Sequence, residues 1–159
     1  MAEGRGRPGG GQVPQTASAR APVGRPTATG PGRVLVALYA VFALAATSRA
    51  GVQLATDFSE APLAYLLSAV SAVVYVIATV ALATDRPWSR PLAVAACSGE
   101  LAGVLTIGTL SLLRPEDFPR ATVWSGYGSG YGFVPLVLPV VGLWWLRRTA
   151  RRARQSVDG

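Results

Sequence analysis

The sequence lacks most of the side chains on which metal binding and nucleophilic catalysis depend. Its 159 residues include no histidine and a single cysteine, Cys97. Because histidine and cysteine are the usual ligands of zinc and haem iron, we expect neither a metal site nor a bound cofactor. Catalysis by a nucleophile–histidine pair is excluded, and one cysteine cannot form a disulfide within the chain. We therefore predict a protein that is not an enzyme and has no catalytic residues.

Charged residues are also scarce. They make up 14% of the chain, whereas soluble domains carry about 25%. Half of the residues are hydrophobic and the mean hydropathy is +0.36. The net charge is +7, and all 15 basic residues are arginine. These arginines gather at the two ends of the chain and in one short loop, so the charge does not indicate a nucleic-acid partner. The composition predicts an integral membrane protein whose surroundings are the lipid bilayer.

Four apolar segments predict an all-α fold, a bundle of four transmembrane helices. They cover residues 33–55, 62–84, 91–113 and 132–146. A span needs about 20 residues to cross about 30 Å of hydrocarbon, so the first three are long enough. The fourth is short unless the glycine-rich segment before it lies at the outer interface. Residues 1–32 are rich in glycine, proline and arginine and predict a disordered cytoplasmic tail, and residues 149–159 predict a basic one.

Tryptophan and arginine mark the membrane boundary at one end of the predicted bundle. Trp88 lies in the loop between the second and third segments, while Trp144 and Trp145 close the fourth segment and are followed at once by Arg147 and Arg148. Tryptophan at the headgroup level, with arginine just beyond it, is typical of a membrane interface.

The distribution of the other arginines predicts the orientation of the bundle. Arginines are concentrated in residues 1–33, in residues 86–90 and in residues 147–154, whereas the other two loops hold four acidic residues against two arginines. The positive-inside rule therefore predicts a multi-pass protein of the inner cell membrane with both termini in the cytoplasm. Signal-peptide cleavage near residues 48–50 is the alternative, and it is disfavoured by Arg49 within that site and by the long leader.

One acidic residue, Glu100, lies near the middle of the third segment. Burying a lone carboxylate at that depth costs at least about 2.5 kcal/mol, so this side chain must face a partner, face water or be protonated. Two interpretations stay open. Glu100 is either a carboxyl group that couples proton or cation movement, or a satisfied polar contact between helices.

Other polar residues could lie near Glu100. Arg49 is the sole candidate counter-charge within a span; it either pairs with Glu100 or extends outward to the headgroups, and we favour the outward orientation. Ser68, Ser71 and Tyr75 follow one another at helical spacing on the second segment. They should face the bundle, where they could meet Glu100 or form ordinary contacts between helices.

Small residues flank Glu100 on the third segment. Ala95, Gly99 and Gly103 are spaced four apart. This spacing is typical of membrane helices that approach each other closely, and it predicts a helix contact on that face.

The segment TVWSGYGSGYG, residues 122–132, resembles the filter sequence of a potassium channel. Trp124 and Ser125 interrupt the filter pattern, and the eight residues that precede Thr122 include two prolines and leave no room for a pore helix. We therefore interpret the segment as a surface at the outer membrane interface. Its aromatic side chains would be those of Trp124, Tyr127, Tyr131 and Phe133.

Three stretches, EAPLAYLLSAVSAVVY, GELAGVL and FPRATVWSGYGSGYGFVPLVLPVVGLWWL, together resemble a group of small four-span integral membrane proteins of actinobacteria. The resemblance covers residues 33–148. It implies an architecture and a membrane setting but no activity, because the group has no assigned function.

Two functional hypotheses follow. The leading one is a non-enzymatic membrane component that associates with itself or with another membrane protein. The alternative is a small transporter coupled to proton or cation movement through Glu100. The two differ in whether Glu100 faces water or a neighbouring helix.

Overall fold

The computed structural model describes residues 30–155, in which helices are joined by short loops. The elements in chain order are α1 (Pro31–Thr56), α2 (Pro62–Ala83), α3 (Ser89–Leu113), the 3₁₀ segments η1 (Pro115–Asp117) and η2 (Ser125–Tyr131), and α4 (Val134–Gln155). No strand occurs within these residues, so the predicted all-helical class is confirmed.

The two predicted tails are described only in part. Of the predicted disordered tail, residues 1–32, the first 29 lie outside the described residues, and Pro31 and Gly32 already belong to α1. Of the predicted basic tail, residues 149–159, the part up to Gln155 continues α4 as a helix. The helix therefore carries the arginines beyond the apolar segment.

Three helices, α1, α2 and α3, are long and apolar enough to cross a membrane. A fourth span exists only if η2 and α4 together form one span, and these two are bent by 99° at the break between them. The apolar part of α4 is too short to cross the membrane alone. Residues 134–146 cover about 20 Å at 1.5 Å per residue, whereas the hydrocarbon layer is about 30 Å thick. The structure thus has three to four candidate spans where the sequence predicts four.

The hairpin of α1 and α2 is packed through small residues. Both helices begin with a proline, Pro31 and Pro62, at a position where the missing N–H has no partner to lose. Buried residues recur every three or four positions along α1, which is the spacing of one helix face. They are Gly32, Leu35, Tyr39, Ala43, Ala46 and Ala50. The buried residues of α2 also include alanines, among them Ala72, Ala78 and Ala81, and small residues allow neighbouring helix backbones to approach closely.

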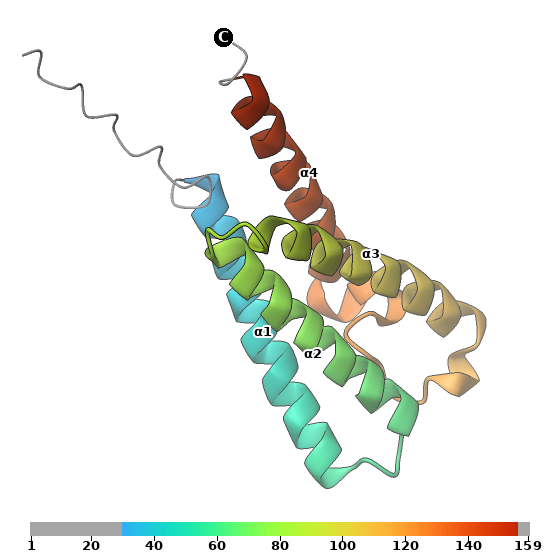
Figure 1. Cartoon of the computed structure of the whole chain (residues 1–159). Coiled ribbons are helices and arrows are strands. Elements are labelled where there is room, and N and C mark those ends of the chain that lie inside the picture. The colour runs from blue at the N-terminus through green and yellow to red at the C-terminus, as the bar shows by residue number, and fades with distance from the viewer. Residues whose placement is uncertain (1–29, 156–159) are drawn as a thin grey trace, which may run out of the picture.

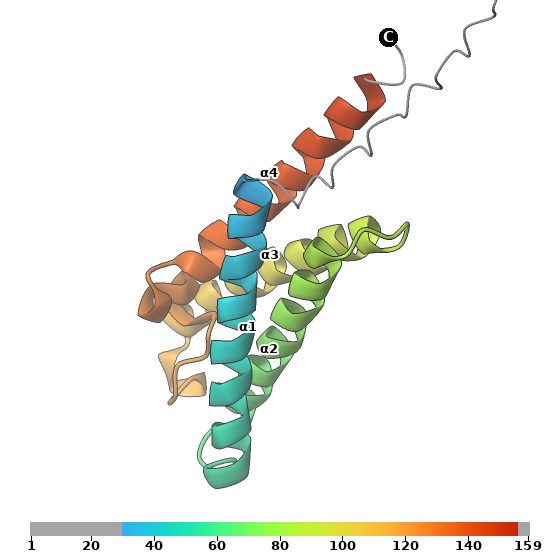
Figure 2. The same ribbon diagram turned by 90° about the vertical axis from the view of Figure 1, so that its left-hand side faces the viewer.

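The other two helices are arranged differently. Figure 1 shows α1 and α2 side by side, with α3 lying across them rather than parallel to them. The second half of α4 extends away from the remaining helices in both views (Figures 1 and 2). The segment that contains η2 packs against α3 and the start of α4, and this places it beside the bundle instead of beyond its end.

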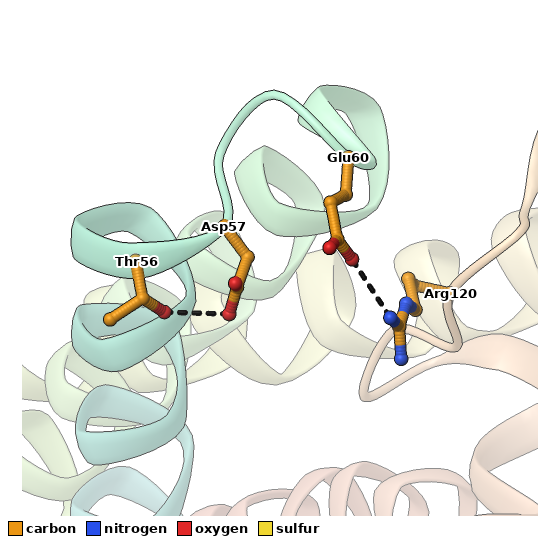
Figure 3. Close-up of polar contacts among 4 residues, drawn as sticks. All are labelled: Thr56, Asp57, Glu60 and Arg120. Atoms are coloured by element: carbon orange, nitrogen blue, oxygen red, sulfur yellow. Dashed lines mark hydrogen bonds and ion pairs between the residues drawn. The ribbon is translucent and has the colours of Figure 1, made fainter.

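Polar contacts connect the turn between α1 and α2 to the segment that precedes η2 (Figure 3). Arg120 forms an ion pair of 2.8 Å with Glu60, and the Thr56 hydroxyl donates a 2.6 Å hydrogen bond to Asp57. The hydrogen bond to Glu60, together with the charge of that carboxylate, raises the pKa of the Arg120 guanidinium above its usual value. Because both side chains of the ion pair are exposed, water screens it and it contributes little to stability.

Candidate functional site

Side chains from three helices surround Glu100 in the middle of the bundle. Glu100 itself is fully buried on α3, and Cys97 lies one turn before it on the same face. The polar neighbours of the carboxyl group are the hydroxyls of Tyr39 from α1 and Tyr75 from α2, both of them fully buried. We refer to Tyr39, Tyr75, Cys97 and Glu100 as the central cluster.

The fourth helix closes the central cluster with a glycine. A Cβ atom at Gly142 of α4 would lie 3.0 Å from the Cys97 sulfur and 3.4 Å from the Tyr39 hydroxyl oxygen. The Tyr39 hydroxyl and the Cys97 sulfur are themselves 3.3 Å apart, at hydrogen-bonding distance. The centres of the Tyr39 and Tyr75 rings lie 6.1 Å apart, so the edges of the two rings are in contact. All four helices therefore meet at this cluster.

The carboxyl group of Glu100 has no hydrogen-bond partner among the described residues. Both of its oxygens, and the Tyr75 hydroxyl oxygen, are buried and make no hydrogen bond of normal distance and angle, although the hydroxyls of Tyr39 and Tyr75 are close neighbours of the carboxyl group. A buried polar group left in this way costs about 1–3 kcal/mol, and more if it is charged. A neutral carboxylic acid is far less costly to bury in such a place than a charged carboxylate.

Arg49 is directed to the glycine-rich segment and not to Glu100. Its guanidinium donates a 2.6 Å hydrogen bond to the Tyr131 hydroxyl and a 3.2 Å hydrogen bond to the carbonyl of Ala121. The guanidinium carbon also lies 5.8 Å from the centre of the Tyr131 ring. The structure therefore gives Arg49 protein partners, where the sequence favoured an orientation toward the headgroups. The open alternative of a pair with Glu100 is not seen.

The predicted polar stripe of α2 reaches the central cluster only through Tyr75. The hydroxyls of Ser68 and Ser71 are buried, and each donates to a carbonyl of its own helix, at 2.9 Å and 2.7 Å respectively. Such bonds satisfy the hydroxyls locally and leave them no donor for a neighbouring helix.

The aromatic residues predicted to form an outer-interface surface are packed inward for the most part. Trp124 is only 4% exposed, and its ring covers Gly103 of α3, where a Cβ atom would lie 2.8 Å from the nearest ring atom. Tyr127 covers Gly108 in the same way, and Tyr131 is held by Arg49. Phe133, which is 49% exposed, remains on the surface. The expected surface is corrected accordingly: its tryptophan belongs to the core.

The small residues of α3 also pack differently from the sequence-based prediction. Around Gly99 a Cβ atom would meet no other atom within 4 Å, and Ala95 is exposed, so neither packs against a helix of this chain. Gly103 makes the close approach, but to the ring of Trp124. The predicted helix contact is therefore replaced by an aromatic side chain in this structure.

A short left-handed turn explains why the glycine-rich segment can fold back onto α3. Gly126, Tyr127 and Gly128 all have positive φ angles, 54°, 59° and 78°. Two glycines adopt this conformation without strain, and a Cβ atom at Gly128 would also lie 2.7 Å from Pro135. The Thr122 hydroxyl accepts hydrogen bonds from the backbone N–H groups of Trp124 and Ser125, and these bonds fix the start of the turn.

The two sides of the central cluster differ in packing. Toward the loop between α2 and α3 lies a pocket of about 450 Å³, which is lined in part by Ala93, Leu82 and Leu146. Ala93 lies two helical turns from Glu100, about 10 Å along α3. On the opposite side, the buried side chains of Val104 and Trp124 cover the cluster. The pocket is thus the open space that begins about two helical turns from Glu100, with the buried Leu82 and Leu146 on that side.

Sequence reasoning missed three members of this site. Tyr39 is a hydroxyl-bearing side chain in the middle of an apolar segment, and Cys97 precedes Glu100 by three residues, which places it on the same helix face. The position of each residue in the sequence could therefore have indicated that it belongs to the site. Gly142 carried none, because only the packing of α4 distinguishes it from other glycines.

Three to four apolar helices indicate a multi-pass membrane protein, and a partner-free carboxyl group at their centre is its most distinctive feature. Comparisons with family models, with curated proteins and with solved structures find no match to the chain. The resemblance to small actinobacterial membrane proteins accordingly stays a prediction.

Proposed function

We propose that this protein is a small proton-coupled membrane transporter in which Glu100 binds and releases the proton. The observation that carries the proposal is the complete burial of a carboxyl group, with both oxygens unpartnered, at the point where four helices meet. A charged carboxylate is far more costly to bury than a neutral acid, so uptake of a proton would stabilise the closed bundle.

The surroundings of Glu100 fit this role. The hydroxyls of Tyr39 and Tyr75 can donate to a carboxylate or accept from a carboxylic acid, so they can serve both protonation states. A pocket lies about two helical turns from Glu100 along α3, and Trp124 covers the opposite side. We further propose that the pocket side is cytoplasmic, in an inner cell membrane, because the arginines of the chain are concentrated at that end.

The experiment is proton flux in lipid vesicles that contain the purified protein and a pH-sensitive dye. An imposed membrane potential should drive proton entry in the parent protein, and Glu100→Gln should abolish it because the amide cannot take up a proton. Glu116→Gln, which alters an exposed acid of η1, is the matched control and should conduct like the parent. Equal flux in the parent, in Glu100→Gln and in empty vesicles at both polarities would refute the proposal.

A second candidate function is the non-enzymatic accessory component that the sequence favoured, which associates with itself or with another membrane protein. The observation that favours it is that Glu100 faces Tyr39 and Tyr75 from neighbouring helices, so its role could be purely structural. The reaction of Glu100 with an apolar carbodiimide separates the two functions. Modification that increases under a proton gradient supports the transporter, whereas unchanged protection together with a stable oligomer supports the accessory component.

A further inference from the structure

A pocket of about 450 Å³ opens where the loop between α2 and α3 meets the middle of α4. One wall is basic and polar, with Arg86, Ser89 and Arg90 from the loop and the start of α3. The facing wall is Trp145 of α4. Asp85 also lines the pocket, so two guanidinium groups against one carboxylate leave the lining with a net positive charge.

Hydrogen bonds hold the basic wall in place before any ligand binds. The Ser89 hydroxyl donates to the Arg86 carbonyl at 2.8 Å and accepts from the Arg86 N–H at 3.3 Å, which closes the turn before α3. The Arg90 guanidinium donates to the carbonyl of Leu146 and so connects α3 to α4. The conformational entropy lost when a ligand binds is smaller at a site ordered in this way.

The facing wall contributes an aromatic ring. Trp145 lines the pocket, while its indole N–H is buried away from solvent. Trp88 and Trp144, at this same end of the bundle, are 44% and 53% exposed, as is typical of tryptophan at the headgroup level.

We propose that this pocket binds the phosphate group of an anionic phospholipid from the adjacent leaflet. Phosphate oxygens match both guanidinium groups. Part of the remaining lining, Ala81, Leu82 and Ala93, is apolar and lies on the membrane side of the arginines along their helices, where an acyl chain would follow the headgroup. This apolar wall favours a lipid over a soluble phosphate.

The test is a titration of the purified full-length chain in detergent with phosphatidylglycerol or phosphatidylcholine, in which bound lipid is counted by native mass spectrometry. The parent should prefer phosphatidylglycerol. Replacing both Arg86 and Arg90 by glutamine should weaken its binding about 30-fold, from the usual contribution of each arginine to anionic-lipid binding.

Two controls make the outcome decisive. Replacing Arg151 and Arg152, exposed arginines of α4 that do not line the pocket, by glutamine removes the same charge and should leave binding within about threefold of the parent. Glycerol phosphate, a soluble headgroup probe, should not compete. Equal losses in the two double variants would mean diffuse attraction, and competition by glycerol phosphate would mean a soluble anion; either result overturns the proposal. Since Arg90 also bonds α4, the single change Arg86→Gln, with about fivefold weaker binding expected, applies if the double variant unfolds.

Discussion

At the scale of single residues, the two charged groups within the spans are separate features of the molecule. Glu100 lies among Tyr39, Tyr75 and Cys97, while Arg49 is bonded to the glycine-rich segment. A buried ion pair would make each charge depend strongly on the other, because losing one partner leaves the other uncompensated. Without that pair, the two residues should respond to substitution independently.

The change Glu100→Gln tests this separation through stability. Glutamine keeps the shape and the hydrogen-bonding capacity of a protonated glutamate. The free energy of unfolding in detergent, followed by circular dichroism, should therefore change by less than about 1 kcal/mol. A buried ion pair would instead lose about 3–5 kcal/mol. Combining Glu100→Gln with Arg49→Gln should give additive changes, within about 0.5 kcal/mol. Recovery of stability in the double variant would contradict the observed placement of Arg49.

At the scale of elements, the glycine-rich segment is a packed part of the bundle. Trp124 and Tyr127 rest on two of the three glycines of α3, Gly103 and Gly108, and the Ser111 hydroxyl accepts a 2.9 Å hydrogen bond from the backbone of Gly126. The segment thus packs directly on α3, and this close approach requires glycine at the points of contact.

Two glycines of α3, one helical turn apart, provide a matched pair for testing this packing. Gly99→Ala meets open space and should stabilise the protein by up to about 1 kcal/mol, since alanine favours the helix. At Gly103 the same change places a methyl group 2.8 Å from the buried Trp124 ring, and the clash should outweigh the gain in helix propensity. Thermal unfolding in detergent compares the two. The added change Trp124→Leu should recover part of the loss at Gly103, and equal effects at both glycines would show that Trp124 does not pack there.

The helices could be predicted from the sequence, whereas most of the contacts between them could not. Apolar periodicity is a local signal, so residues 62–84 were expected to be helical and Pro62–Ala83 is the observed helix. The neighbours of Glu100 depend on how each helix is rotated, which no local pattern determines. The helical spacing of Tyr75 from two serines predicts that it faces the bundle. No such pattern of polar residues surrounds Tyr39, so its place beside Glu100 could not be predicted from spacing. Trp124 was placed at the surface from the general preference of tryptophan for interfaces, and the left-handed turn that directs it inward could not be derived from the sequence.

At the scale of the whole molecule, the outstanding property is the path of the chain after α3. Three helices are long enough to cross the membrane, and the bent pair of η2 and α4 is the fourth candidate. If the bent pair crosses, both termini lie on the same side; if it returns to the side from which it came, they lie on opposite sides. The arginines of α4 favour crossing, because they match those of the loop between α2 and α3.

Reporter fusions decide between these two paths. Fusions after Asp57 and after Asp117 should report the outside, and fusions after Arg86 and at Gly159 should report the cytoplasm, since arginine-rich segments stay inside. A paired enzyme reporter that is active on one side only gives the measurement at each position. An outside signal at Gly159, with the other three as expected, would mean that η2 and α4 form a re-entrant segment and that the chain spans the membrane three times.

The alanine-lined contact between α1 and α2 has a consequence for motion. Alanine has no rotatable side-chain dihedral, so the alanines of this contact lose no side-chain entropy on packing. The large side chains that meet across the contact are aromatic, because the Tyr75 ring packs against the rings of Tyr39 and Phe42. Any sliding of one helix along the other would have to move these rings past each other, and would at the same time change the distance of the Tyr39 and Tyr75 hydroxyls from Glu100.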